Sequence, residues 1–208
     1  MILDHITVTA PSLPEGVEHV RACLGIDVPY GTTHPEMGTH NHRLRLGGDA
    51  YLEIIAIDPA APAPAGPRWF GFDRMDEVRS DWASGRRLRA WVARTDDIDA
   101  LLTAQGETFG RKIRIGQFAR FSLLPDGALP LSGALPSVID RAGQQPPSAK
   151  MADLGARLLE LVLEHPSPDE IAALYRKLEI RDPPPVRKGE TIRYLATIET
   201  PGGIRTLT

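Results

Sequence analysis

The sequence predicts an α+β protein built from repeated strand–helix units, and three observations support this fold class. Near residues 3, 88 and 157, a segment of alternating apolar and polar residues is followed by an amphipathic segment. Each amphipathic segment has a single apolar face, as expected for a helix that packs on one side of a sheet. Two more alternating segments follow the first helix, and the Gly-Gly-Asp turn between them is typical of a hairpin.

The first unit is predicted over residues 1–57. Ser12 and Glu15 have the spacing at which each side chain caps the other's backbone N–H, so a helix begins there, and Gly25 ends it. The apolar stripe of this helix consists of Leu13, Val17, Val20 and Leu24. The strands of the resulting β-α-β-β-β module are expected at residues 3–10, 26–30, 40–46 and 50–57.

The second unit is predicted over residues 88–143. Its elements are a strand at 88–94, a helix from Asp96 to Gly106, and strands at 118–124 and 135–141. Residues 58–87, which come before it, form a Pro- and Ala-rich connector with an aromatic segment at Trp69 and Phe70.

The third unit is a C-terminal βαβ-type extension over residues 150–208, expected to pack on the same body. Its strands are predicted at residues 157–163 and 191–200. Its helix begins at Ser167, where an N-cap residue, a first-turn proline and an acidic capping partner coincide.

Composition excludes several classes of function. The net charge is −3, and the Lys and Arg residues are spread along the chain, so we expect no nucleic-acid partner. No apolar run approaches the roughly 20 residues that span a bilayer, and no basic-then-apolar leader is present. The single cysteine excludes an intrachain disulfide. We therefore expect a soluble, cytoplasmic protein with no membrane partner.

Strand alternation gathers polar residues on the face of the first unit that is free of helices. Ile6 and Val8 must face the helix, so His5 and Thr7 face the opposite way. The same alternation in the other two strands places Asn41, Arg43 and Glu53 on that face.

Glu53 is the most informative of these residues, because a carboxylate inside the apolar strand YLEIIAI is costly unless a cation, metal or donor compensates it. One interpretation is an ion pair with Arg43 or Arg45 across the hairpin. The other is a metal site with His5, since imidazole and carboxylate both bind divalent first-row metals.

Two more histidines flank Asn41. His40 and His42 lie on the leucine-bearing face by alternation, so they are second-tier ligands unless a bulge re-aims them. The triplet His40-Asn41-His42 does not indicate an HNH nuclease. Those motifs spread their three residues over a ββα-metal element, and this chain lacks a basic surface.

Three stretches, LDHITVTA, THPEMGTHNHRLRLGGDAYLEIIAID and PRWFGFD, resemble the glyoxalase-like branch of the vicinal oxygen chelate superfamily, specifically over residues 1–73. The resemblance implies paired β-α-β-β-β modules that form a cup-shaped mixed sheet with the helices on its outer face. It also implies that His5, early on the first strand, and Glu53, on the last, bind a divalent metal ion (Zn, Fe, Mn or Ni). Asn41 matches a ligand-facing position.

The second unit departs from the superfamily's pattern. Arg89, Ala90 or Trp91 occupies the place of a histidine, and Ser137 is near the place of the glutamate. One module therefore keeps both metal ligands and the other keeps neither. The site is completed by water, by His40 or His42, or by a partner subunit, or it has lost the metal and kept the cup.

Three functions follow from these observations. The first is a metal-dependent lyase, isomerase or dioxygenase for a small oxygenated compound, with Glu53 catalytic. Its substrate-binding residues are Thr7, Asn41, Arg43 and Trp69. The second is a metal-free module that binds or sequesters a small molecule, and the third is an interaction domain in which His5 and Glu53 form a structural ion pair. We expect a homodimer in each case, because the third unit leaves sheet edges to cover.

Overall fold

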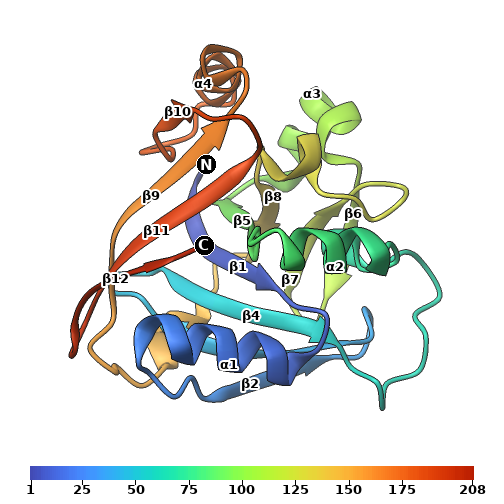
Figure 1. Ribbon diagram of the computed structural model, residues 1–208. Coiled ribbons are helices and arrows are strands. Elements are labelled where there is room, and N and C mark those ends of the chain that lie inside the picture. Colours follow the sequence, from blue (N-terminus) through green and yellow to red (C-terminus); the bar gives the residue numbers. More distant parts are fainter.

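The polypeptide forms two β-sheets, and the larger one curls into a half-barrel (Figure 1). The structure is a computed structural model and describes residues 1–208. The larger sheet has eight strands in the order β2-β3-β4-β1-β5-β8-β7-β6, and the smaller has four in the order β10-β9-β11-β12. The concave side of the eight-stranded sheet is called the cup below. The predicted α+β class with a cup-shaped mixed sheet is therefore confirmed.

The first module contains β1 (Ile2–Thr9), α1 (Leu13–Leu24), β2 (Tyr30–His34), β3 (Thr39–Arg45) and β4 (Tyr51–Ile57). Ser12 Oγ accepts a hydrogen bond from the backbone N–H of Glu15, and Gly25 ends α1 with a φ of 68°. The strand expected at residues 26–30 is wrong, because β2 begins at Tyr30. Ile26 and Val28 are buried in the core as a loop, and Pro29 has no N–H to donate to a ladder.

The second module repeats this order with β5 (Leu88–Thr95), α3 (Ile98–Phe109), β6 (Arg111–Ile115), β7 (Ala119–Leu123) and β8 (Ser137–Asp140). In each module the first strand pairs in parallel with the last, β1 with β4 and β5 with β8. The modules join through antiparallel pairing of β1 with β5. Helix α3 passes Gly106 and kinks at Gln105, and β6 is an additional strand that the sequence analysis did not identify.

The segment between the modules is more structured than a connector. It contains a 3-10 turn η1 (Trp69–Gly71) and helix α2 (Met75–Ala83). Val78 is the only buried residue of α2, so this helix has no apolar stripe for a periodicity argument to detect.

The C-terminal sheet contains β9 (Arg157–His165), β10 (Val186–Lys188), β11 (Arg193–Thr200) and β12 (Gly203–Leu207), with α4 (Pro168–Lys177) after β9. The sequence analysis identified β9, α4 and β11. It missed β10 and β12, because β10 has only three residues and β12 is mostly exposed and lacks a clear alternation. Two 3-10 turns, η2 (Pro130–Gly133) and η3 (Pro147–Lys150), lie in the loops before and after β8.

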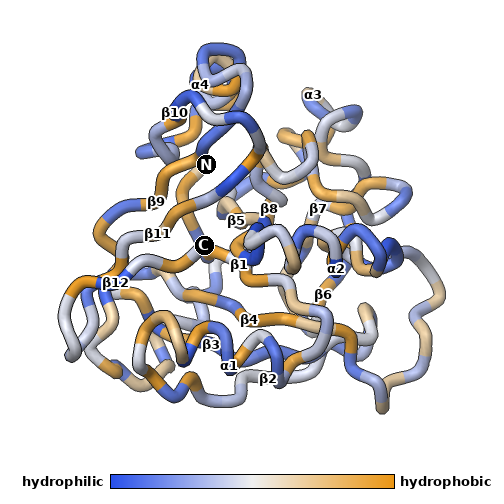
Figure 2. Tube along the Cα trace, viewed as in Figure 1, coloured by the Kyte–Doolittle hydropathy of each residue, from blue (hydrophilic) through white to orange (hydrophobic).

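Two apolar clusters lie on opposite sides of the large sheet. The main cluster of 27 residues joins the convex side to α1 and to the C-terminal sheet. The second cluster of 12 residues lies in the cup. Figure 2 shows the corresponding apolar stretches along the central strands. Ile54 belongs to the main cluster and Ile55 to the cup, as alternation requires.

Tyrosine side chains connect the C-terminal sheet to the second module. The hydroxyl of Tyr175 donates a 2.7 Å hydrogen bond to the carbonyl of Ala134, and that of Tyr194 donates a 2.8 Å bond to the carbonyl of Gly133. Trp91 packs edge-on against Tyr175 on the same side. None of the helices combines the length and the apolar character that a bilayer crossing requires.

Candidate functional site

The cup contains a cavity of about 100 Å³ to which both modules contribute. The first module supplies His5, His34, Asn41, Arg43, Tyr51 and Glu53. The second module supplies Ile115, Ala119, Phe121, Ile139 and Arg141, and the intervening segment supplies Trp69 and Phe70. Most of the polar groups therefore come from the first module and most of the apolar wall from the rest of the chain.

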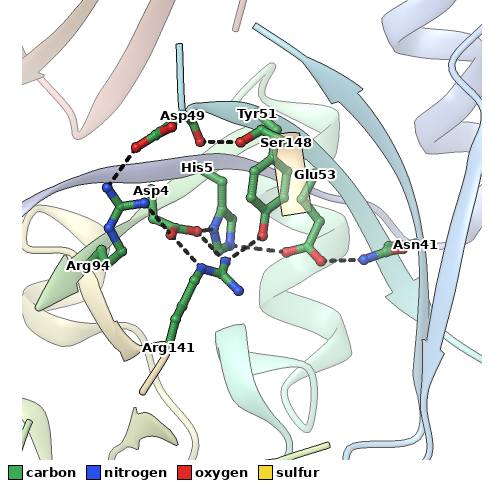
Figure 3. Close-up of polar contacts among 9 residues, drawn as sticks. All are labelled: Asp4, His5, Asn41, Asp49, Tyr51, Glu53, Arg94, Arg141 and Ser148. Atoms are coloured by element: carbon green, nitrogen blue, oxygen red, sulfur yellow. Dashed lines mark hydrogen bonds and ion pairs between the residues drawn. The ribbon is translucent and has the colours of Figure 1, made fainter. Parts of the chain in front are cut away.

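His5 is held by a buried carboxylate. Its Nδ1 donates a 2.6 Å hydrogen bond to Oδ1 of Asp4, whose side chain is fully buried (Figure 3). Arg141 donates to both oxygens of Asp4, at 2.8 and 2.5 Å. Burial raises the pKa of Asp4, but the hydrogen bonds from Arg141 and His5 outweigh it and hold that pKa well below its usual range. Asp4 is therefore ionised and His5 Nδ1 carries a proton.

Asp4 reaches the same side as His5 because β1 contains a bulge. In the pairing with β5, Leu3 is opposite Ala93 and His5 is opposite Val92, so Asp4 is the extra residue. Strict alternation would have placed Asp4 on the convex side. Strand alternation in the sequence therefore could not predict that Asp4 faces the cup.

Glu53 lies on the other side of the His5 ring. Its Oε2 is 3.4 Å from His5 Nε2, and its Oε1 accepts a 2.6 Å hydrogen bond from Nδ2 of Asn41. Burial raises the pKa of Glu53, but His5 and Asn41 outweigh it and lower that pKa to about 2. Burial lowers the pKa of His5, and the flanking carboxylates of Asp4 and Glu53 reverse this, so the net change is upward.

Asn41 joins three strands of the first module. While Nδ2 donates to Glu53, Oδ1 accepts a 2.8 Å hydrogen bond from the backbone N–H of Thr32. Gly31 on β2 makes room for this side chain. A Cβ at Gly31 would lie 2.2 Å from Oδ1 of Asn41 and 2.7 Å from Nε of Arg43.

Arg43 is opposite Glu53 in the β3–β4 register but forms no ion pair with it. Neither Arg43 nor Arg45 contacts the carboxylate, so the cross-hairpin ion pair that the sequence also allowed is wrong. The partners of Glu53 are instead Asn41 and His5. The Nε atom of Arg43 is buried and has no hydrogen-bond partner.

The other predicted site residues differ in position. Trp69 lines the cavity, with its ring edge-on to those of His34 and Phe121. Thr7 does not line the cavity; it is fully buried, and its hydroxyl has no partner. His40 and His42 do not line it either, and His42 donates instead to the carbonyl of Val28.

The sequence analysis did not name His34, Tyr51 or Arg141 as site residues, although strand alternation places Tyr51 on the same face as Glu53. The Tyr51 ring stacks on His5 with 4.6 Å between centroids, and its hydroxyl accepts a hydrogen bond from Arg141. Nδ1 of His34 shares a hydrogen bond with Oγ1 of Thr39, and burial lowers the pKa of His34. Placing β2 at its true position would have put His34 in a strand. Arg141 was expected inside the strand at 135–141 but was not named as a site residue, and in the structure it follows the end of β8.

His5 and Glu53 fit two positions of a metal site. Metal–ligand bonds of about 2.0–2.2 Å to nitrogen and oxygen place two ligand atoms about 3.0–3.5 Å apart, and His5 Nε2 and Glu53 Oε2 are 3.4 Å apart. The Asp4 bond to Nδ1 is the outer-shell contact that orients metal-binding histidines. No group of three His, Cys, Asp or Glu side chains gathers there, so any further ligands would be of another kind. Ala90 and Val92 of β5 contribute only apolar groups.

Comparisons with known proteins agree with this architecture. A family model described as a glyoxalase-like domain matches residues 3–179. A hypothetical protein from Staphylococcus aureus has a similar structure over its whole length, with a TM-score of 0.59, 10% identity and coverage of 100% of this chain and 98% of that one. No curated protein sequence matches the chain significantly.

Methylmalonyl-CoA epimerases are also similar. The enzyme from Streptomyces coelicolor gives a TM-score of 0.42 at 17% identity, covering 68% of this chain and 97% of its own. The enzyme from Mycobacterium tuberculosis gives a TM-score of 0.42 at 16% identity, covering 72% of this chain and 91% of its own.

Proposed function

The chain belongs to the glyoxalase-like domain family, and on that premise we propose that its cup binds a small oxygenated compound beside a divalent cation held by His5 and Glu53. The reaction class is that of a lyase, isomerase or dioxygenase. The observation that carries the proposal is the 3.4 Å approach of His5 Nε2 to Glu53 Oε2, two buried side chains that line the cavity.

This approach requires a positive charge between the two atoms. Nδ1 of His5 keeps its proton and donates it in the hydrogen bond to Asp4. A neutral ring would therefore turn the lone pair of Nε2 toward a carboxylate oxygen of Glu53. Two acceptors at that distance repel each other unless a proton or a metal ion lies between them. A divalent cation held there by His5 and Glu53 would supply Lewis-acid chemistry to a carbonyl oxygen of the ligand.

The residues around the pair have separate roles in this proposal. A carboxylate with a pKa of about 2 is a weak base, so Glu53 is suited to hold a cation and not to accept a proton. His34 is the better proton acceptor, because burial lowers its pKa and keeps its ring neutral at pH 7. Asn41 positions Glu53, while Trp69 and Phe121 form an apolar wall for the ligand body.

A metal-free binding module is the second candidate, and one observation favours it. Arg141, Asp4, His5, Glu53 and Asn41 form a continuous hydrogen-bonded and ionic chain once His5 is protonated. In that state a proton on Nε2 takes the place of the cation. The cup would then bind its ligand without metal chemistry.

Metal analysis and calorimetry separate the two candidates. Protein purified without chelator is titrated with Zn²⁺, Mn²⁺, Ni²⁺ and, without oxygen, Fe²⁺. We expect one site per chain in the wild type and its loss in His5→Ala and Glu53→Gln, with His40→Gln as the control outside the cavity. Equal metal binding by all four proteins would overturn the proposal, and a wild type that binds ligands but no metal would support the second candidate.

A further inference from the structure

We propose that Arg43 binds the anionic group of the cup's ligand and that this ligand is a small carboxylic acid. This inference rests on the proposed function only in placing the ligand in the cup. It names a ligand class that neither the fold nor the comparisons assign.

Arg43 is the cation of the cavity that lacks an anionic partner. The charge of the other arginine, Arg141, is paired with Asp4 through Nε and Nη2, and Nη2 also donates to Tyr51. No side-chain nitrogen of Arg43 forms a hydrogen bond or ion pair, although its Nε is buried. Its two terminal nitrogens are not buried and also have no partner, so an anion that enters the cavity can pair with them and compensate the charge beside the buried Nε.

The nearby carboxylate does not fill this role. Glu53 is directly opposite Arg43 in the strand register, yet both of its oxygens are taken, one by Asn41 and one by His5. The chain therefore satisfies its own acid with other groups and leaves the guanidinium for an external one. Arginine binds a carboxylate through two parallel hydrogen bonds, which also fixes the orientation of the ligand.

The local backbone keeps this arginine in place. Gly31 on β2 has no side chain, and a Cβ there would lie 2.7 Å from Nε and 3.1 Å from Cγ of Arg43. The position has no left-handed φ that would require glycine. Its small size therefore serves the side chains of Arg43 and Asn41 that pass over it.

The cavity limits the size and character of the acid. A water molecule needs about 10–15 Å³ of such space, so about 100 Å³ accommodates roughly seven to ten non-hydrogen atoms. Trp69, Phe70 and Phe121 line the wall, so the body of the acid is apolar or aromatic. Benzoate meets both limits, and lactate is a smaller acid that probes the charged group without a large apolar body.

Binding of acids and their neutral amides tests the inference by calorimetry. The probes are lactate and lactamide, and benzoate and benzamide, with wild-type protein, Arg43→Gln, Arg43→Lys and Arg45→Gln. We expect the wild type to prefer an acid over its amide by at least tenfold, Arg43→Gln to lose that preference, and Arg43→Lys to recover part of it. Arg45 is the matched control, since it lies on the same strand with its Nε also buried and unpartnered but does not line the cavity.

Three results would overturn the inference. They are equal binding of acid and amide by the wild type, no binding of either probe acid at millimolar concentration by folded wild type, and the same preference in Arg43→Gln as in Arg45→Gln. Each titration is run with chelator and with Zn²⁺, and metal binding is measured separately. Arg43→Gln is expected to bind metal as the wild type does. A wild type that binds no metal but still prefers the acid over its amide would count against the proposed function and leave this inference standing.

Discussion

Oδ1 of Asp4 lies 2.6 Å from Nδ1 of His5, and this bond determines which nitrogen of the ring faces the cup. Because the Nδ1–H of His5 donates to Asp4, Nε2 is directed at Glu53. The position of Asp4 depends on the bulge in β1, so the orientation of His5 is set by the backbone of β1 as well as by side chains.

Replacing Asp4 with Asn should weaken the site and the fold together. The amide cannot balance Arg141, which would be left as a largely buried cation, so we expect a loss of about 3–5 kcal/mol in the free energy of unfolding. Metal affinity should fall about 10–100-fold, as for other outer-shell substitutions. Urea denaturation and metal titration measure the two effects. An unchanged metal affinity in the folded variant would refute the orienting role.

Stability of the metal-free protein should be greatest in weakly acidic solution. The pKa of His5 is raised from 6.5, so its contribution is complete below pH 6.5 and is lost as the pH rises through the folded-state pKa. Glu53 has a pKa of about 2 against 4.5 in the unfolded chain, so its contribution is complete above pH 4.5 and is lost as the pH falls toward 2. Thermal melts with chelator between pH 3 and 9 should show a melting temperature that falls toward both ends of this range. In His5→Gln the melting temperature should fall less as the pH rises above 6.5. An equal fall in the variant and the wild type would contradict the assignment to His5.

Asn41→Asp should make the fold depend on cations. The new carboxylate would lie where Asn41 Nδ2 is now 2.6 Å from Glu53 Oε1, and two ionised carboxylates at that distance repel strongly. We expect a lower melting temperature at pH 7 that divalent cations partly restore, because a second carboxylate then joins His5 and Glu53 as a third ligand. Melts with and without Zn²⁺ test this, and a variant that Zn²⁺ does not stabilise more than wild type would refute it.

Gly31→Ala should disturb the cup more than the fold. The added methyl group displaces the side chains of Asn41 and Arg43, so we expect acid binding to fall at least tenfold. Gly106→Ala is the matched control, because a Cβ there meets nothing within 4 Å and its φ is not left-handed. That control should keep full binding and gain up to about 1 kcal/mol from helix propensity. Equal binding by the two variants would count against Gly31 as a positioning residue.

Tyr194→Phe should loosen the attachment of the C-terminal sheet. Its hydroxyl bonds to the carbonyls of Gly133 and Ala134, so we expect a loss of about 1–2 kcal/mol in the free energy of unfolding. Tyr30→Phe is the control, since Tyr30 is 55% exposed and should change stability by less than about 0.5 kcal/mol. Urea denaturation compares them, and an equal midpoint for both variants would exclude the proposed attachment.

Much of the fold was predictable because the strands next to the center of the large sheet alternate regularly. Period two placed His5, Asn41 and Glu53 on one face, and the structure brings these three together. The same rule failed at Asp4, where a bulge breaks the alternation. Arg141 was placed in the strand expected at 135–141, but it follows the end of β8 and was not named as a site residue. Thr7 shows another limit, because facing the cup does not mean reaching its cavity.

Other expectations lie outside what the fold can test. The divisions at residues 57, 87 and 143 remain predictions, as do the homodimer and the cytoplasmic location. Strands β2 and β6 end one sheet, and β10 and β12 end the other. Light scattering in solution would show whether a second chain covers any of these edges.

The unequal contribution of the two modules to the cavity has a consequence for how such a protein diversifies. The ionic chain from Asp4 to Asn41 depends almost entirely on residues 2–57, whereas Phe121 and Ile139 shape the opposite wall. Substitutions in that wall can alter which compound is accepted while the chemistry stays intact. Selection for a new substrate would therefore act mainly on the half of the fold that forms this wall.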